Sequence, residues 1–326
     1  MKERIGVVGA GRMGRGIALS FAFAGVPVLL IDLKERSDED RQALVNAAID
    51  ELRSDLNFLA TAEIVAADKI QDILGLIEFA SAESAQTLLM TCTLIFEGVP
   101  EVMDVKRDAF AYIGKYCAVD AIVASTTSTF VVTDLAALIV NPERFVNAHW
   151  LNPAHLMPLI EVSRGDLSSP QTVEKIVATL ESIGKVPIVC SASPGYIVPR
   201  IQCLAMSEAA RLVEEGVASA EDVDKAVKYG FGLRFAVLGL LEFIDWGGGD
   251  ILYYGSNYLS EAIDPRFKGP QIVADNMKNN RNGLRDGKGF YDYKDTDVNL
   301  YREQRLRDFI AQLRHSNMLP VEGVAK

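Results

Sequence analysis

The chain has 326 residues, of which 49% are hydrophobic and 24% are charged, and its formal net charge at pH 7 is −11. At roughly 150 residues per domain, this length predicts two domains, and the composition is typical of a globular protein with a large core. The acidic balance argues against nucleic acid as a partner, because binding to phosphates requires clustered Lys and Arg.

The cysteines and the apolar segments indicate the compartment. The four cysteines, Cys92, Cys117, Cys190 and Cys203, form no CxxC pair and no cluster with histidine at zinc-ligand spacing. We therefore expect no metal site, and mostly buried thiols in a reducing compartment. The N-terminus leads at once into a short apolar segment and glycines, unlike a signal peptide. The longest apolar stretch, residues 17–31, is interrupted by glycine and proline, so we expect no membrane span and a cytoplasmic protein.

Strand and helix patterns alternate over the first 190 residues. We expect helices over Met13–Ala24, residues 35–75, Lys106–Tyr116 and Pro170–Ile183. Short apolar runs between them predict strands over Ile5–Val8, Val26–Ile31, Leu94–Glu97, Ala121–Ala124, Val146–His149, Leu159–Val162 and Val186–Val189. This order predicts an α/β fold, with a doubly wound Rossmann-type sheet in a domain that covers residues 1–190.

The pattern changes after Pro194-Gly195, where no convincing strand follows. Helical periodicity over Ile201–Glu215, Ala220–Tyr229 and Ile251–Ala262 predicts a smaller all-helical domain over residues 191–293. Residues 294–326 are charged. They carry apolar residues at helical spacing and predict a C-terminal helical extension through Leu306, Phe309, Ile310 and Leu313.

A glycine-rich turn follows the first predicted strand and opens the first helix. Gly9 allows the tight turn, Gly11 lets the backbone approach a pyrophosphate, and Gly14 permits close helix packing. Met13 belongs to the same turn and is expected at the cofactor. Asp32 ends the next strand, where a carboxylate accepts hydrogen bonds from a ribose 2′-hydroxyl and repels a 2′-phosphate. This βαβ unit predicts NAD rather than NADP as the cofactor, with a flavin as the alternative.

A histidine and a carboxylate lie on two consecutive predicted strands. His149 ends one strand, Glu161 lies on the next, and Asn152-Pro153 turns the chain between them. Histidine can take up a proton near neutral pH, and a carboxylate on its other ring nitrogen would stabilise the imidazolium. Such a pair is typical of the oxidation of an alcohol, which loses a hydroxyl proton as well as a hydride. His155 and His315 have no carboxylate so well placed.

Together these residues resemble the L-3-hydroxyacyl-CoA dehydrogenase family. The resemblance covers roughly residues 4–293, and its separated motifs stand in the family's order. They read VVGAGRMGRGIA, EGVPEVMDVKRDAF, ASTTSTF, HWLNPAHLMPLIEV, SPGYIVPRI and GLRDGKGFYDY.

The resemblance implies roles for individual residues. His149 would be the base, Glu161 its orienting partner, and Ser128 a donor to the substrate oxygen. Residues at the family's cofactor-lining positions are Glu101, Lys106 and Asn152. Without the resemblance, Ser128 would be an ordinary loop hydroxyl, Lys106 a solvated helix charge and Asn152 a turn former. The family also implies a homodimer formed through the helical domain.

Three departures from the family's pattern concern the substrate. Pro199 replaces an asparagine that contacts the substrate in the family, and Gln202 is a candidate replacement. Arg234 follows a GxGL run, as in relatives that oxidise small free hydroxy acids, and could bind a carboxylate. Its alternative is a surface arginine or an interdomain salt bridge. Residues 56–68 contain neither Lys nor Arg, although acyl-CoA members usually offer lysines to the CoA phosphates there.

The sequence therefore predicts an NAD-dependent dehydrogenase that oxidises the 3-hydroxyl of a 3-hydroxyacyl-CoA, such as 3-hydroxybutyryl-CoA, to the 3-keto compound. This reaction belongs to fatty-acid metabolism. Two alternatives remain. One is the same chemistry on a free small β-hydroxy acid, as in gulonate or carnitine dehydrogenases, with Arg234 binding the carboxylate. The other is a non-catalytic NAD-binding structural protein, because a fold alone does not fix a function.

Overall fold

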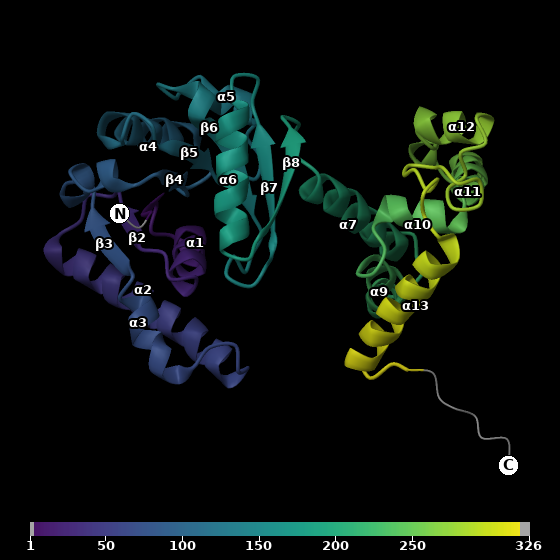
Figure 1. The fold of residues 1–326 in the computed structure, drawn as a ribbon, viewed down its shortest axis with the longest axis horizontal. Helices are drawn as coiled ribbons and strands as arrows, with labels where there is room; N and C mark the ends of the chain where they lie inside the picture. Colours follow the sequence, from purple (N-terminus) through teal and green to yellow (C-terminus); the bar gives the residue numbers. More distant parts are fainter. Residues whose placement is uncertain (1–2, 320–326) are drawn as a thin grey trace, which may run out of the picture. The chain divides into compact units, whose positions relative to one another are not determined.

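The computed structural model describes residues 3–319, and the chain divides into two compact units, Met1–Ala205 and Met206–Lys326 (Figure 1). The first unit is a sheet covered by helices, and the second consists of helices and loops. This arrangement confirms the predicted fold class. The predicted domain limits stay predictions. The one near residue 190 falls at the end of the last strand, while the division between the units lies within the following helix, Val198–Glu214.

The first unit contains one eight-stranded sheet in the order β3-β2-β1-β4-β5-β6-β7-β8. All neighbouring strands pair in parallel except β6 and β7, which are antiparallel, so β7 and β8 run against the rest. The strands are β1 (Ile5–Val8), β2 (Val28–Asp32), β3 (Ile77–Ser81), β4 (Leu94–Glu97), β5 (Ile122–Ser125), β6 (Phe145–Trp150), β7 (Leu159–Arg164) and β8 (Val186–Ser191).

Helices cover both faces of this sheet. One core packs the helices α1, α2, α3 and α6 against one face, and a second core packs α4 and α5 against the other. The α-helices are α1 (Arg12–Phe23), α2 (Asp38–Thr61), α3 (Ile70–Leu74), α4 (Met103–Tyr116), α5 (Val132–Ala136) and α6 (Pro170–Ser182). The short 3₁₀ turns are Ala67–Lys69, Ser84–Gln86, Leu89–Thr91 and Pro142–Arg144.

The sequence prediction missed one strand of this sheet. β3 (Ile77–Ser81) pairs in parallel with β2 at the edge of the sheet. Only its first residue is buried, and Glu78 on it binds Arg4 through a salt bridge. A half-exposed strand that contains a charge lacks the continuous apolar run by which buried parallel strands are recognised.

The strand order places a crevice beside β1. The neighbours of β1 are β2 and β4, and the connections leave them in opposite directions from this point. In open α/β sheets, ligands bind outside the carboxyl ends of the strands at such a switch point. Gly9 follows β1, Asp32 ends β2 and Gly98 follows β4, so all three lie at this edge.

The second unit begins within α7 (Val198–Glu214) and contains a π-helical segment, Val227–Gly232, in the predicted GxGL region. Its other elements are α8 (Ala220–Ala226), α9 (Leu233–Phe235), α10 (Leu240–Gly247), α11 (Gly249–Ala262), the 3₁₀ turn Pro265–Phe267, α12 (Gln271–Lys278) and α13 (Val298–His315). The predicted C-terminal helical extension stays a prediction, since α13 lies within it but its residues 320–326 are outside the described residues. Within residues 3–319, no helix is both long and apolar enough to cross a membrane.

Asp245 on α10 organises the loop between α12 and α13. Its buried carboxylate accepts hydrogen bonds from the backbone N–H groups of Phe290 and Tyr291 at 3.0 and 2.9 Å, and from the Tyr293 hydroxyl at 3.2 Å. A Cβ atom added to Gly289 would lie 2.0 Å from this carboxylate. The glycine- and tyrosine-containing motif near residue 290 is therefore explained by the close approach of the loop to Asp245.

Replacing this carboxylate should destabilise the second unit. In Asp245→Asn an amide NH₂ would face a buried N–H donor, and we expect the free energy of unfolding to fall by about 2 kcal/mol. Chemical denaturation followed by circular dichroism measures the change. Asp297 is a matched control because it accepts bonds from Asn299 N and Leu300 N as the exposed N-cap of α13. Asparagine caps helices equally well, so Asp297→Asn should leave stability unchanged. Equal effects of the two variants would contradict this account.

Candidate active site

A cavity of about 590 Å³ lies at the switch point of the sheet. The glycine turn, the end of β2 and the loop after β4 form its wall, and they contribute Gly9, Ala10, Gly11, Arg12, Met13, Asp32, Leu33, Lys34, Gly98 and Val99 among others. Three of the four predicted residues of the turn, including Met13, therefore line it. Gly14 supports the turn from behind, because a Cβ atom there would lie 1.9 Å from the carbonyl oxygen of Gly9.

The residues of this cavity fit a dinucleotide. Gly9 has a φ of +116°, and an added Cβ would lie 2.6 Å from the carbonyl oxygen of Gly98, so only glycine is compatible with this turn. An added Cβ on Gly11 would meet open space, which leaves room for a ligand close to the backbone. Gly11 is also the N-cap of α1, whose free N–H groups favour a pyrophosphate.

Asp32 is held at the end of β2 by its neighbours in sequence. The Nε atom of Arg36 donates to one carboxylate oxygen at 2.5 Å, and the backbone N–H of Lys34 lies 3.4 Å from the other. A carboxylate has about four acceptor sites, so both contacts leave capacity for ribose hydroxyl groups. Arg36 therefore orients the carboxylate of Asp32, which the sequence predicts to bind the ribose.

The antiparallel pairing of β6 and β7 brings His149 and Glu161 together. The two residues are direct partners in the strand register, and the Nδ1 atom of His149 lies 2.8 Å from Oε2 of Glu161. Both side chains are buried, with relative exposures of 7% and 0%. The carboxylate fixes the orientation of the imidazole and leaves Nε2 as the nitrogen that can exchange a proton.

Glu161 also binds the beginning of α7. Its second oxygen, Oε1, accepts hydrogen bonds from the backbone N–H groups of Ile197 and Val198 at 2.9 and 2.8 Å. These are groups at the N-terminus of a helix, which carries a partial positive charge. Pro199 is the second residue of this helix, in the first turn where a missing N–H is tolerated.

A buried ion cluster supports the loop that follows β5. Lys106 on α4 is 1% exposed, and its ammonium group lies 3.0 Å from Glu97 and 3.1 Å from Glu101. Glu97, fully buried at the end of β4, also accepts a 2.7 Å hydrogen bond from the hydroxyl of Ser125 at the end of β5. Lys106 is therefore a buried partner of two carboxylates, and the alternative of a solvated helix charge is wrong.

Glu101 fastens the residues on both sides of Ser128. It accepts hydrogen bonds from the hydroxyl of Thr127, from the backbone N–H of Thr129 at 3.1 Å and from the Thr129 hydroxyl at 2.7 Å. Burial alone would raise the pKa of Glu101, but the two threonines and the charge of Lys106 outweigh it and lower the pKa to about 2. The carboxylate is thus ionised at neutral pH, and Ser128 projects from a tethered loop as an exposed residue.

The remaining predicted residues are exposed. Asn152 follows β6, is joined to Pro153 by a cis peptide bond, and borders a second hollow together with Arg12. Gln202 lies on α7. Arg234 lies on α9, and its guanidinium group is 4.9 Å from the ring centroid of Phe243. The stacking makes Arg234 more than an isolated surface charge, but its free edge still faces solvent.

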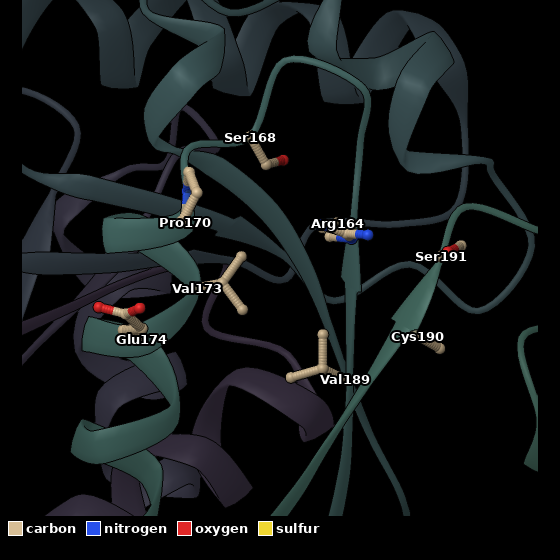
Figure 2. Close-up of a pocket in the computed structure, with 8 residues that line it drawn as sticks. All are labelled: Arg164, Ser168, Pro170, Val173, Glu174, Val189, Cys190 and Ser191. Carbon is tan, nitrogen blue, oxygen red and sulfur yellow. The ribbon is translucent and has the colours of Figure 1, made fainter.

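A further hollow lies on the other face of β7 (Figure 2). It has a volume of about 290 Å³ and is lined by Arg164 of β7, Val189 of β8 and Glu174 of α6, among others. Successive side chains of a strand point to opposite faces, so Arg164 lies on the opposite face from Glu161. This hollow is therefore separate from the His149–Glu161 pair, and its charges of opposite sign favour no particular ligand.

Sequence reasoning missed several residues of this site. Glu97 and Ser125 connect the strand ends to Lys106, and Tyr196 lies beside His149 with ring centroids 5.7 Å apart. A signal for Glu97 exists in the sequence, because a glutamate ends an otherwise wholly apolar strand. The partners of Tyr196 are Phe130 in a loop and His149 on β6, both distant in sequence, so its contacts have no local signature.

Comparisons with known proteins match both units. The profile of the 3-hydroxyacyl-CoA dehydrogenase NAD binding domain matches residues 4–193, and that of the C-terminal domain of the same family matches residues 195–293. A 3-hydroxybutyryl-CoA dehydrogenase from Clostridioides difficile is 31% identical over 292 residues, 89% of this chain and 99% of that protein. The crystal structure of a 3-hydroxyacyl-CoA dehydrogenase from Archaeoglobus fulgidus superposes with a TM-score of 0.75 at 30% identity, covering 97% and 100% of the two chains.

Another relative acts on a different compound. The 5-formyl-3-hydroxy-2-methylpyridine 4-carboxylate 5-dehydrogenase of Mesorhizobium japonicum is 31% identical over 318 residues, which cover 96% of this chain and 98% of that protein. The match to the NAD binding domain confirms the predicted cofactor, and these relatives confirm the prediction of an NAD-dependent dehydrogenase. Matched over both of its units, the chain belongs to the 3-hydroxyacyl-CoA dehydrogenase family.

Proposed function

We propose that the chain oxidises the 3-hydroxyl group of a 3-hydroxyacyl-CoA, such as 3-hydroxybutyryl-CoA, to the 3-keto compound. The observation that carries this proposal is the buried pair of His149 and Glu161, joined at 2.8 Å. A neutral imidazole whose Nδ1–H is bound to a carboxylate presents Nε2 as a base to a hydroxyl group. The family membership supplies the reaction class, and the pair supplies the proton acceptor.

In this mechanism His149 removes the hydroxyl proton. NAD, held by the glycine turn and Asp32, would supply the acceptor for the hydride of carbon 3. Glu161 stabilises the imidazolium that forms. Its other oxygen is already held by two backbone N–H groups, so the carboxylate has little freedom to move during the proton transfer. We propose that the hydroxyl of Ser128 donates to the substrate oxygen, and that Glu101, Lys106 and Asn152 line the cofactor site.

A free hydroxy acid is the second candidate substrate. One curated relative acts on a free pyridine carboxylate, and the match to it extends over more of this chain than the match to the Clostridioides difficile enzyme. Residues 56–68 carry neither Lys nor Arg, although the phosphates of CoA require compensating charge. In this second case Arg234 would bind the substrate carboxylate, with Gln202 as a further contact.

We also propose that the chain forms a homodimer through the helical unit. Within residues 3–319, no residue of α7 or α13 is buried. On α11 the large apolar side chains Ile251, Tyr254 and Tyr258 are 67%, 65% and 68% exposed. An exposed apolar surface of this extent is typical of a protein interface, and a second copy with the same surface would cover it. A cytoplasmic location stays a prediction.

Removing the proposed base should abolish most turnover. We expect His149→Gln to lower kcat about 10²- to 10⁴-fold, the usual contribution of general base catalysis, while the affinity for NADH stays near normal. NADH formation from 3-hydroxybutyryl-CoA and NADH binding by fluorescence measure the two quantities. His155→Gln is the matched control and should retain turnover. An equal loss of turnover and of NADH affinity would instead indicate a structural role for His149.

The substrate class is tested by offering 3-hydroxybutyryl-CoA and free 3-hydroxybutyrate in parallel. If the free acid is the substrate, Arg234→Met should raise its KM about 10- to 100-fold through loss of a charged hydrogen bond, with NADH affinity unchanged. Arg302→Met is a control in the same unit, since its guanidinium also lies over an aromatic ring, that of Trp246. Turnover of the thioester alone, unaffected by Arg234→Met, would exclude the free acid.

The dimer is tested by its mass in solution. Light scattering should give twice the chain mass of 35.6 kDa, and the double variant Tyr254→Glu/Tyr258→Glu should give the mass of one chain. The introduced carboxylates would lose their hydration at an interface without a partner charge. Phe58→Glu is the control, since Phe58 is 63% exposed but lies on α2 of the first unit. A double variant that stays dimeric would place the interface elsewhere.

A further inference from the structure

The turn before α7 contains a strained, buried tyrosine. Tyr196 is 4% exposed and has a φ of +44°, a left-handed conformation that is uncommon for a bulky residue. The turn is closed by hydrogen bonds from Tyr196 N to Ser193 O at 3.1 Å and from Arg200 N to Gly195 O at 3.0 Å. Residues in such conformations persist only where their surroundings hold them, and they are concentrated at functional sites.

The ring of Tyr196 lies against the imidazole of His149. The ring centroids are 5.7 Å apart, and the ring planes are inclined by 33°. The two residues that follow Tyr196 donate their backbone N–H groups to Glu161. One short turn therefore contacts both members of the pair, the imidazole through a side chain and the carboxylate through the backbone.

The hydroxyl of Tyr196 reaches a third element. It donates a 2.9 Å hydrogen bond to the carbonyl oxygen of Phe130, in the loop that follows β5. Burial, followed by the charges of Glu101 and Glu161 among others, raises the pKa of Tyr196 well above its usual range. The hydroxyl group thus stays protonated at neutral pH and acts as a donor.

The hydrogen bond from Tyr196 to Phe130 holds the loop on the C-terminal side of Ser128. On the N-terminal side of Ser128, the carbonyl oxygen of Thr127 accepts a hydrogen bond from the side-chain amide of Asn147. Asn147 lies two residues before His149, on the same face of β6. The backbone N–H of Phe130 also donates to the Thr127 hydroxyl at 3.0 Å. Ser128 therefore lies between two anchors, and Tyr196 provides the one at Phe130.

We propose that Tyr196 is a positioning residue for the dehydrogenase reaction, and that its hydroxyl sets the loop that carries Ser128. The inference rests on the proposed function, because it assigns Tyr196 an effect through Ser128. A tyrosine that only filled space would be replaced by phenylalanine without consequence, since the two rings have the same shape. The hydroxyl group alone distinguishes the two cases.

The test compares Tyr196→Phe, Ser128→Ala and the double variant in the full-length chain, with the better of the two substrates named above. We expect Tyr196→Phe to lower kcat about tenfold, since small displacements of a positioned group have effects of this size, while KM and the Kd for NADH change less than about twofold. In the Ser128→Ala background, Tyr196→Phe should have little further effect on kcat, because the group that it positions is already missing.

A second tyrosine provides the control for stability. Tyr112 on α4 donates its hydroxyl to the carbonyl oxygen of Ala82 at 2.6 Å, a contact of the same kind in the same unit. Tyr112→Phe should lower the Tm about as much as Tyr196→Phe and leave kcat unchanged.

The possible results separate the inference from the proposed function. Suppose that Ser128→Ala lowers kcat but Tyr196→Phe leaves kcat unchanged. The positioning role is then overturned and the proposed function stands. The same holds if the double variant loses kcat by the product of the two single losses. If Ser128→Ala leaves kcat unchanged, the roles of Ser128 and of Tyr196 both fail. Only a His149→Gln variant that retains full turnover would overturn the proposed catalytic pair itself.

Discussion

The carboxylate of Glu161 is fully buried, and the half of the sheet that carries the candidate active site is arranged around it. A buried charge costs several kcal/mol unless hydrogen bonds replace its hydration. Three N–H donors do so here, one from the imidazole of His149 and two from the start of α7. His149 can be the first of these donors because the chain reverses between β6 and β7. The antiparallel register then places His149 directly opposite Glu161.

The cluster around Lys106 likewise compensates a buried charge, in this case a positive one. Here a buried ammonium group is compensated by Glu97 and Glu101, and Ser125 completes the shell of Glu97. Removing one member of such a cluster is strongly destabilising, because it leaves an uncompensated buried charge. The cluster thus gives the loop of Ser128 a rigid base on the carboxyl ends of β4 and β5, where flexible threonines and serines alone would not hold one geometry.

The local parts of this architecture could be predicted from the sequence. The βαβ unit with Gly9, Gly11 and Asp32 is specified within one short segment, since each residue answers a backbone or charge requirement of its neighbours. The pairing of His149 with Glu161 was also within reach, because the two strands are consecutive. The contacts of Ser125 and Tyr196 were not, since both join segments that are distant in sequence and meet only in the fold. β3 was missed for a related reason: its stability comes from pairing with β2 and not from its own apolar pattern.

One edge of the sheet has a consequence for the solubility of the protein. β8 is the last strand in the order, and Val186 and Val189 on it are 55% and 48% exposed. The backbone N–H of Val186 donates to the carbonyl oxygen of Pro158, on the side of β7. Backbone nitrogens of successive residues in a strand point to opposite sides, so the nitrogen of residue 187 points away from the sheet. That position is a proline, which has no N–H to offer to an incoming strand. Pro187 thus weakens the template that an apolar edge strand presents, and it protects the sheet against edge-to-edge aggregation at the strand that leads into the turn of Tyr196.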